Sequence, residues 1–253
     1  MRLKRKVKKI IYVSLSAMAM LVLIAFTGKR IAEKPVHNVK VHIDRHGDEA
    51  FTDQIEILNL LNAEATDYVL GLSMEQLDLK VLEERVENHP FVKDAQVYKD
   101  IKGNLLISVD QARPIARIFD PSGPDFYIDI DGYVLPTSSR YTARVPIIQI
   151  EKFELDKVNI NYTEYGGSLM ELLGFIQNDP FWKAQIAQLN IADNGEVTML
   201  PQVTKQDIAF GQPENITSKF KKLSLFYKKI LPNKGWNTYS SVNLKFKNQI
   251  ICQ

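Results

Sequence analysis

The sequence predicts an α+β protein with a single N-terminal transmembrane helix followed by two further domains. Three observations support this fold class. An uncharged apolar run follows a basic cluster, the order strand, helix, helix, strand, strand occupies residues 36–112, and residues 113–253 mix short alternating strands with amphipathic helices. At 253 residues, of which 45% are hydrophobic, the chain is long enough for one large domain or two small ones.

Residues 1–9 contain six Lys or Arg and are expected to form a basic cytoplasmic tail. Residues 10–27 ("IIYVSLSAMAMLVLIAFT") carry no charge and would span about 27 Å as a helix, close to the thickness of a bilayer core. The excess of positive charge before this run orients the N-terminus toward the cytoplasm. We therefore predict a transmembrane anchor over residues 10–28, with the rest of the chain outside the cytoplasm.

A cleaved signal peptide is the alternative interpretation of the same residues. An Ala-x-Ala pattern occurs at Ala17 and Ala19, but it lies inside the apolar run and not at its polar edge. The run is also longer than the usual apolar region of a signal peptide, which favours an uncleaved anchor.

The charge and the cysteine content argue against a general polyanion binder and against a disulfide-stabilised fold. Outside residues 1–9 the chain contains 26 basic and 30 acidic residues, so it is not expected to bind polyanions in general. Cys252 is the only cysteine, so no internal disulfide can form.

Within residues 36–112, apolar and polar residues first alternate as in a strand, and apolar residues then recur at helical spacing. A helix capped by Thr52 is expected to bury Ile55, Leu58 and Leu61. A second helix over "DLKVLEERVENHP" ends at Pro90, and two strands joined at Gly103 complete the domain.

Residues 113–253 predict a mixed α/β domain with an antiparallel-rich sheet. Expected in order are a hairpin in "FYIDIDGYVLP" with a type I′ turn at Asp131-Gly132, a helix starting at the capping box Ser168-x-x-Glu171, and a hairpin at Asn194-Gly195. A long amphipathic helix over residues 215–231 then ends at Pro232. Residues 242–251 are predicted to close the sheet as an exposed edge strand.

Motifs for chemistry are missing from the sequence. Asp125, Asp129 and Asp131 do not fit a calcium loop, and the three N-terminal histidines (His37, His42, His46) do not share one strand face. No nucleophile elbow, zincin or phosphate-loop motif occurs. We therefore predict that the protein is not an enzyme and that it has no catalytic residues, no metal site and no cofactor. The lysines of the long helix are either a solvated face or a patch for anionic polymer or lipid headgroups.

Several stretches resemble the FtsQ/DivIB family of bacterial cell-division proteins, whose first exported domain is a POTRA module. The resemblance is carried by the basic tail with its anchor and by "LDLKVLEERVENHPFVKDAQVYKDIKGNLLISVDQARPIARI", "YIDIDGYVLP", "IAFGQPENITSKFKKLSLFYKKIL" and "VNLKFKNQIIC". Gln111, Ala112 and Ile150 depart from residues that are frequent in the family.

This resemblance implies a non-enzymatic scaffold of the divisome in the inner membrane at the septum. It would bind FtsB/DivIC-like and FtsL-like coiled-coil partners and help regulate septal peptidoglycan synthesis. The implied partner strand adds to the last strand, which assigns partner binding to Leu223, Tyr227, Val242, Leu244, Phe246, Asn248 and Ile250.

Two alternatives remain. POTRA modules also occur in assembly and translocation factors of the cell envelope, but no series of alternating segments long enough for a membrane barrel follows residue 112. A hydrolase acting on the cell wall lacks a recognisable motif.

Overall fold

The computed structural model of the protein describes residues 5–32, 34–45, 47, 49–62, 69–119, 123–151 and 155–253. The chain divides into two compact units, the first ending at Gln111 and the second beginning at Ala112; Phe51 packs with the second unit. Each unit has its own hydrophobic core.

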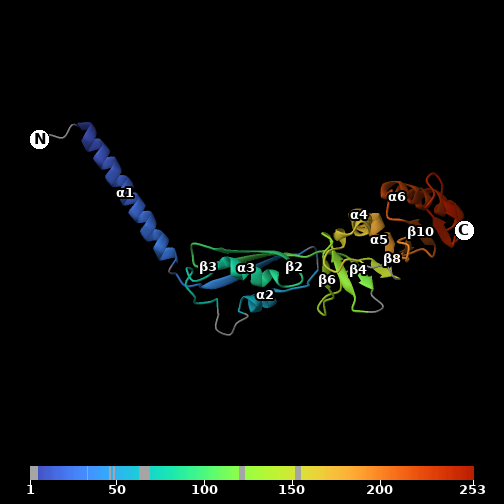
Figure 1. The fold of residues 1–253 in the computed structure, drawn as a ribbon, viewed down its shortest axis with the longest axis horizontal. Helices are drawn as coiled ribbons and strands as arrows, with labels where there is room; N and C mark the ends of the chain where they lie inside the picture. The colour runs from blue at the N-terminus through green and yellow to red at the C-terminus, as the bar shows by residue number, and fades with distance from the viewer. Residues whose placement is uncertain are drawn as a thin grey trace. The chain divides into compact units, whose positions relative to one another are not determined.

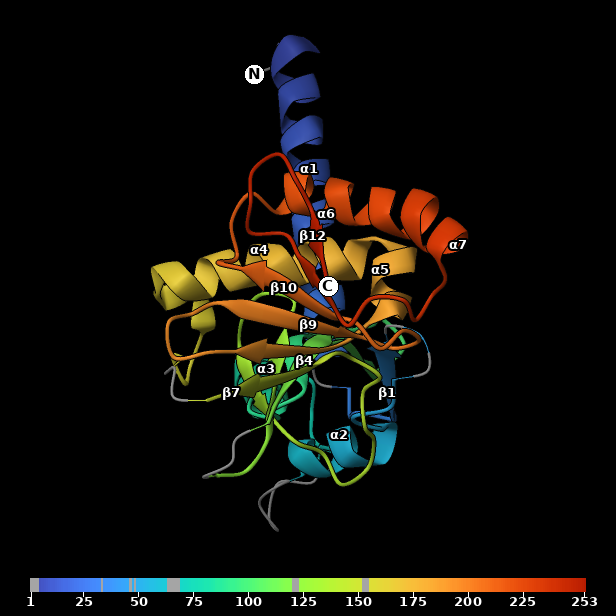
Figure 2. The ribbon, with the colours of Figure 1, turned by 90° about the vertical axis from the view of Figure 1, so that its right-hand side faces the viewer.

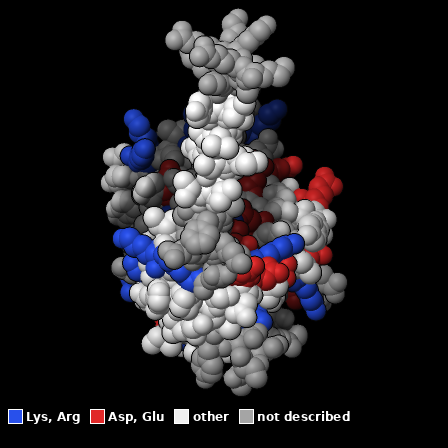
Figure 3. Space-filling view, turned by 90° about the vertical axis from the view of Figure 1, so that its left-hand side faces the viewer, with Lys and Arg blue, Asp and Glu red and all other residues white. Residues whose placement is uncertain are grey.

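The N-terminal helix α1 (Arg5–Ala32) contains the whole apolar run that the sequence predicts as an anchor. Figure 3 shows the described side chains of this helix, residues 10–23, as a column without Lys, Arg, Asp or Glu. Among the residues that the structure describes, no helix meets the length and apolarity of a membrane span.

The first unit has the predicted β-α-α-β-β order (Figure 1). Its elements are β1 (Asn38–Asp44), α2 (Gln54–Leu61), α3 (Leu79–Glu87), β2 (Val92–Lys99) and β3 (Asn104–Gln111). The sheet order is β1-β3-β2, with β3 parallel to β1 and antiparallel to β2. Both helices pack on one face, where Ile57, Leu61, Leu82 and Val86 are buried against the strands.

Two details of α2 differ from the prediction. The N-cap is Asp53, whose side chain accepts a hydrogen bond of 2.8 Å from the Glu56 N–H, while Thr52 is buried. Ile55 is exposed, and Ile57 takes the buried position instead. The apolar stripe passes through Ile57 and Leu61, and Ile55 is turned away from it, because residues two positions apart in a helix are separated by about 200°.

The second unit contains a nine-stranded sheet in the order β12-β11-β10-β9-β8-β7-β4-β5-β6. Five of the eight neighbouring strand pairs are antiparallel, which agrees with the predicted antiparallel-rich sheet. The strands are β4 (Pro114–Phe119), β5 (Phe126–Asp129), β6 (Val134–Pro136), β7 (Ile147–Ile150), β8 (Ile186–Ile191), β9 (Val197–Pro201), β10 (Asp207–Gly211), β11 (Ser241–Asn243) and β12 (Ile251–Cys252).

Helices cover one face of this sheet, with α4, α5 and α6 lying together beside β9 and β10 in Figure 2. The helical segments are η1 (Ile160–Tyr162), α4 (Glu164–Asn178), α5 (Pro180–Gln185), α6 (Ile216–Leu225), the π-helical turn η2 (Phe226–Ile230) and α7 (Leu231–Lys234). Aromatic rings join these helices, since Phe175 of α4 stacks on Phe220 of α6 with centroids 4.5 Å apart, and Trp182 of α5 lies 4.9 Å from Phe220.

Helix α4 begins earlier than the capping box predicts. Its N-cap is Thr163, whose hydroxyl accepts from the Gly166 N–H at 3.0 Å, and Ser168 lies inside the helix. Gly166 is required there, because a Cβ on it would lie 1.7 Å from the Ile160 carbonyl oxygen. Gly166 therefore allows a close approach of α4 to η1.

The hairpin of β5 and β6 forms as predicted, but its turn is of another type. Gly132 has φ +86°, and the Gly132 N–H donates to the Asp129 carbonyl at 3.0 Å. Asp131 is not among the described residues with positive φ, so the turn is not type I′, which needs two such residues. A glycine following a non-primed turn fits the three-residue hairpin loop with a bulge.

The predicted single strand over residues 242–251 is wrong. The chain forms β11, reverses through residues 244–250, and returns as β12, which pairs antiparallel with β11. The alternating apolar residues Val242, Leu244 and Phe246 have the spacing of a longer strand, but of the three only Val242 lies in a strand. The sheet still ends in the last strand of the chain, as expected.

Candidate functional site at the terminal sheet edge

The last strand, β12, forms one edge of the nine-stranded sheet. The Ser241 N–H donates to the Gln253 carbonyl, and the Gln253 N–H donates to the Ser241 carbonyl, both at 3.1 Å. Because hydrogen-bonding directions alternate along an antiparallel strand, the N–H and C=O of Cys252 point away from β11. The edge is thus open to an added strand, but it is short, as natural edges are when they avoid unwanted pairing.

The connection between β11 and β12, residues 244–250, is held on both sides by lysines. Lys222 of α6 donates to the carbonyl oxygens of Leu244, at 2.8 Å, and of Phe246. Lys245 forms an ion pair with Glu196 in the β8–β9 turn, and its hydrogen bond lowers the pKa of the Glu196 carboxyl. Burial lowers the pKa of Lys222. These contacts give the connection a defined position beside α6.

The helix behind this edge contains the π-helical turn η2. A π turn inserts one extra residue, so two consecutive aromatic residues, Phe226 and Tyr227, are both buried. The Tyr227 hydroxyl accepts from Gln185 Nε2 at 3.2 Å and lies 3.4 Å from the Thr204 hydroxyl. Burial raises the pKa of Tyr227, so its hydroxyl remains neutral. Its hydrogen bonds are made inside the unit.

The structure divides the seven predicted partner-binding residues into two groups. Leu223, Tyr227, Val242 and Leu244 are buried in the core of the second unit. Phe246 is 45% exposed, Asn248 is exposed, and Ile250 is partly buried against the core. Only the second group presents side chains at the surface, all three from the connection between β11 and β12.

Sequence reasoning missed three residues of this region. Lys222 fixes the connection, Cys252 presents the open main-chain groups, and Trp236 is 51% exposed after α7. A lysine that donates to carbonyls 22 residues away leaves no local pattern in the sequence. Trp236 could have been found, because a large aromatic residue beside Gly235 in a polar loop is a frequent sign of an interface.

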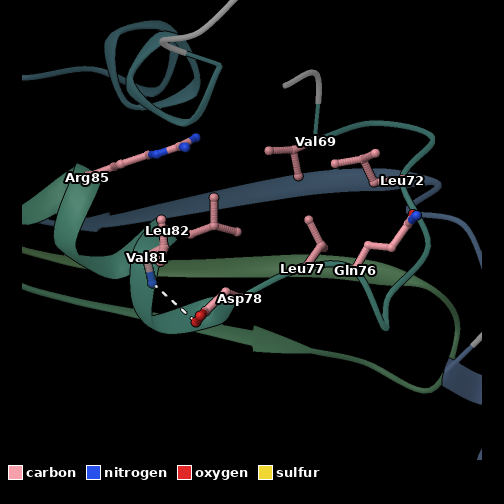
Figure 4. Close-up of a pocket in the computed structure, with 8 residues that line it drawn as sticks. All are labelled: Val69, Leu72, Gln76, Leu77, Asp78, Val81, Leu82 and Arg85. Carbon is pink, nitrogen blue, oxygen red and sulfur yellow. Dashed lines mark hydrogen bonds between the residues drawn. The ribbon is translucent and has the colours of Figure 1, made fainter. Parts of the chain in front are cut away.

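Two pockets lined by described residues lack side chains arranged for chemistry. The pocket in Figure 4, beside α3, has a volume of about 150 Å³, below the range of about 300–1,000 Å³ typical of ligand sites. A larger pocket of about 380 Å³ at β6 is mainly apolar, and its Asp125 is already paired with Arg117 at 2.7 Å. No group of three or more potential metal ligands occurs among the residues that the structure describes.

A small β-α-α-β-β domain followed by a large mixed sheet with a free terminal edge places the chain among POTRA-bearing proteins, and residues 35–110 match the family described as POTRA-like domain. Residues 113–253, more than half of the chain, match the family described as FtsQ/DivIB, C-terminal related. The chain therefore belongs to the FtsQ/DivIB family. It is similar to "Cell division protein FtsQ" of Rhodothermus marinus, with 25% identity over 186 residues that cover 72% of this chain and 67% of that protein.

Proposed function

We propose that this protein is a scaffold of the bacterial divisome. Support comes from the family of its second unit and from a relative named as a cell division protein. The scaffold binds FtsB/DivIC-like and FtsL-like coiled-coil partners and helps regulate septal peptidoglycan synthesis. It carries out no reaction itself, and its contribution is to hold partners in place.

The proposed topology is a single-pass protein of the inner membrane at the septum. Residues 1–9 lie in the cytoplasm, residues 10–28 cross the bilayer, and both folded units are extracytoplasmic. The support is the sequence of α1, with eighteen uncharged residues between a cluster of six basic residues and the pair Lys29 and Arg30.

The open edge at β12 is the observation that carries the partner-binding role. A polypeptide that adds to this edge can exchange main-chain hydrogen bonds with Cys252, and side chains of the neighbouring connection supply specificity. Phe246, Asn248 and Ile250 are the predicted side-chain contacts. Leu223, Tyr227, Val242 and Leu244 act behind them, by supporting the edge from the core.

Two measurements test this proposal. A fluorescent fusion of the full chain is expected to concentrate at midcell in dividing cells; a uniform distribution around the envelope contradicts a role in division. The second measurement is capture of the FtsB-like partner by the full chain carrying Phe246→Glu, which is expected to be lost.

The matched control for Phe246→Glu is Phe119→Glu. Phe119 is also 45% exposed, but it lies on β4, six strands away from β12 in the sheet order. Capture by Phe119→Glu should equal that of the wild type. Unchanged capture by Phe246→Glu would show that the partner binds elsewhere.

A further inference from the structure

Positive charge is concentrated at the C-terminal end of the second unit. Residues 216–253 contain eight lysines and no Asp, Glu or Arg, whereas residues 10–215 contain 18 basic and 30 acidic residues. The lysines lie on α6, η2, α7 and the connection between β11 and β12. Such a one-signed region attracts a partner of opposite charge.

Three of the eight lysines have local roles. Lys219 donates to the Gln212 carbonyl at 2.7 Å and lies over the Phe210 ring, Lys222 holds the terminal connection, and Lys245 pairs with Glu196. The other five are exposed and form no ion pair or side-chain hydrogen bond with any residue that the structure describes. We call them the terminal basic surface: Lys221, Lys228, Lys229, Lys234 and Lys247.

Large apolar side chains lie along the same segments. Leu225, Trp236 and Phe246 are each about half exposed. Exposed aromatic residues are enriched at interfaces, where they provide the buried anchors. The same stretch of the chain therefore combines exposed lysines with exposed apolar side chains that could anchor a partner.

The neighbouring sheet edge favours an anionic polypeptide over an anionic lipid surface as the ligand. A lipid surface can neutralise lysines, but it cannot continue a β-ladder on the outward main-chain groups of Cys252. A polypeptide can do both. Because β12 contains only two residues, an added strand forms few ladder hydrogen bonds, so side-chain charges must contribute much of the affinity.

Lys222 connects these two features. Its bonds to Leu244 and Phe246 hold the connection that leads into β12 against α6, so this connection, with Lys247, lies next to the helix that carries Lys221.

We propose that the partner segment bound at β12 is an extended acidic peptide whose carboxylates face the terminal basic surface. This inference rests on the proposed function, since it assigns the chemistry of the partner at the same edge. Binding involves no covalent step, and salt screens the attraction between the carboxylates and the lysines.

The test uses the full chain held in nanodiscs of neutral phosphatidylcholine. The probe is a fluorescent 12-residue peptide that alternates Glu with Thr around one central Leu, and the comparison peptide has Gln in place of every Glu. At about 50 mM salt the Glu peptide is expected to bind at least about tenfold more tightly than the Gln peptide. At about 500 mM salt this difference should nearly vanish.

The double variant Lys228→Gln/Lys229→Gln is expected to lose most of the preference for Glu. Its matched control, Lys40→Gln/Lys157→Gln, removes two exposed lysines from β1 and from the loop before η1, and it should retain the preference. Circular dichroism of each variant confirms that the fold is unchanged.

Equal binding of the two peptides would overturn the inference. It would also be overturned if added phosphatidylglycerol vesicles bound in a manner that depends on Lys228 and Lys229 while the Glu peptide did not, because the surface would then recognise lipid. Either result leaves the midcell localisation and the capture of the FtsB-like partner intact, so failure of this inference is distinguishable from failure of the proposed function.

Discussion

Lys222 Nζ lies 2.8 Å from the carbonyl oxygen of Leu244 and joins helix α6 to the end of strand β11. The same ammonium group donates to the Phe246 carbonyl, so one side chain satisfies two acceptors of a connection that otherwise runs over the surface. A charge-assisted bond to a backbone carbonyl holds a loop more firmly than a neutral one does. The position of the terminal edge therefore depends on this lysine.

Lys222→Met should loosen the terminal hairpin without unfolding the unit. Methionine keeps the length and apolar stem but donates no hydrogen bond, so we expect a loss of about 1–2 kcal/mol in the free energy of unfolding. Hydrogen exchange should accelerate at the Ser241 and Gln253 amides, which pair across this hairpin. Lys221→Met, at an exposed neighbour, is the control and should change neither quantity.

Gly132→Ala should destabilise the second unit. Gly132 has φ +86°, and a Cβ there would lie 2.4 Å from Asn161 Nδ2 and 2.7 Å from Asn159 Oδ1. Backbone strain and steric overlap together should cost about 2–4 kcal/mol, measured by denaturant unfolding. Gly174→Ala is the matched control, because Gly174 lies inside α4 with open space around it. That substitution should be neutral or stabilise by up to about 1 kcal/mol.

Asp129 has a structural role that its sequence context does not reveal. From the sequence, Asp129→Asn is expected to be nearly silent. In the structure the carboxylate is buried and accepts from the Asp131 N–H at 3.0 Å and the Tyr133 N–H at 2.8 Å. Asp129→Ala should therefore cost about 1–3 kcal/mol in unfolding free energy, and Asp129→Asn should cost less, because its amide oxygen still accepts. Equal stability of both variants and the wild type would show that these hydrogen bonds contribute nothing.

Hydrophobic periodicity was sufficient to predict most elements of the fold. The strands and the second helix of the first unit follow it directly, and so do the hairpin at Asn194-Gly195 and the buried stripe of Leu169, Leu172 and Ile176 on α4. These predictions succeed because each depends on residues close together in the chain.

The errors arise where contacts that the hydrophobic pattern does not reveal decide the local structure. Helix α4 is capped by Thr163, before two glycines, and the close approach of the Ile160 carbonyl requires a residue without a side chain at Gly166. Pro232 does not end the long helix, since the preceding π turn places it in the first turn of α7, where proline is tolerated. The reversal after β11 depends on Lys222, which is remote in sequence, so the edge of the candidate site could not be predicted in detail.

Stability near the terminal hairpin should depend on pH through Glu196. The hydrogen bond from Lys245 lowers the carboxyl pKa below its ordinary value of 4.5. A carboxyl group with a lowered pKa in the folded state stabilises the fold above the unfolded pKa, and this contribution is lost as pH falls through the folded pKa. The wild type should exceed Glu196→Gln by at most about 1 kcal/mol at pH 7, because the pair is partly solvated.

This advantage should disappear in acid, and thermal unfolding of both proteins between pH 2 and pH 7 measures it. Glu171→Gln, at an exposed position of α4, is the control and should show no comparable pH dependence. An advantage that persisted below the folded pKa would indicate that the pair acts through packing and not through charge.

Cys252 provides a direct probe of the terminal edge, since it is the only cysteine and lies on β12. Burial raises the pKa of its thiol, so the reactive thiolate is scarce at neutral pH. Alkylation by a maleimide at pH 7 should therefore be slower than that of a free thiol, and the pH profile of the rate should be displaced upward. Binding of a partner strand should slow alkylation further by covering the edge.

The control for this probe is the double variant Cys252→Ser/Ser139→Cys. It moves the thiol to an exposed loop position between β6 and β7, where alkylation should be fast and insensitive to the partner. If a saturating partner leaves the alkylation rate of Cys252 unchanged, strand addition at β12 is wrong, because any strand paired with the outward main chain of Cys252 restricts access to its side chain.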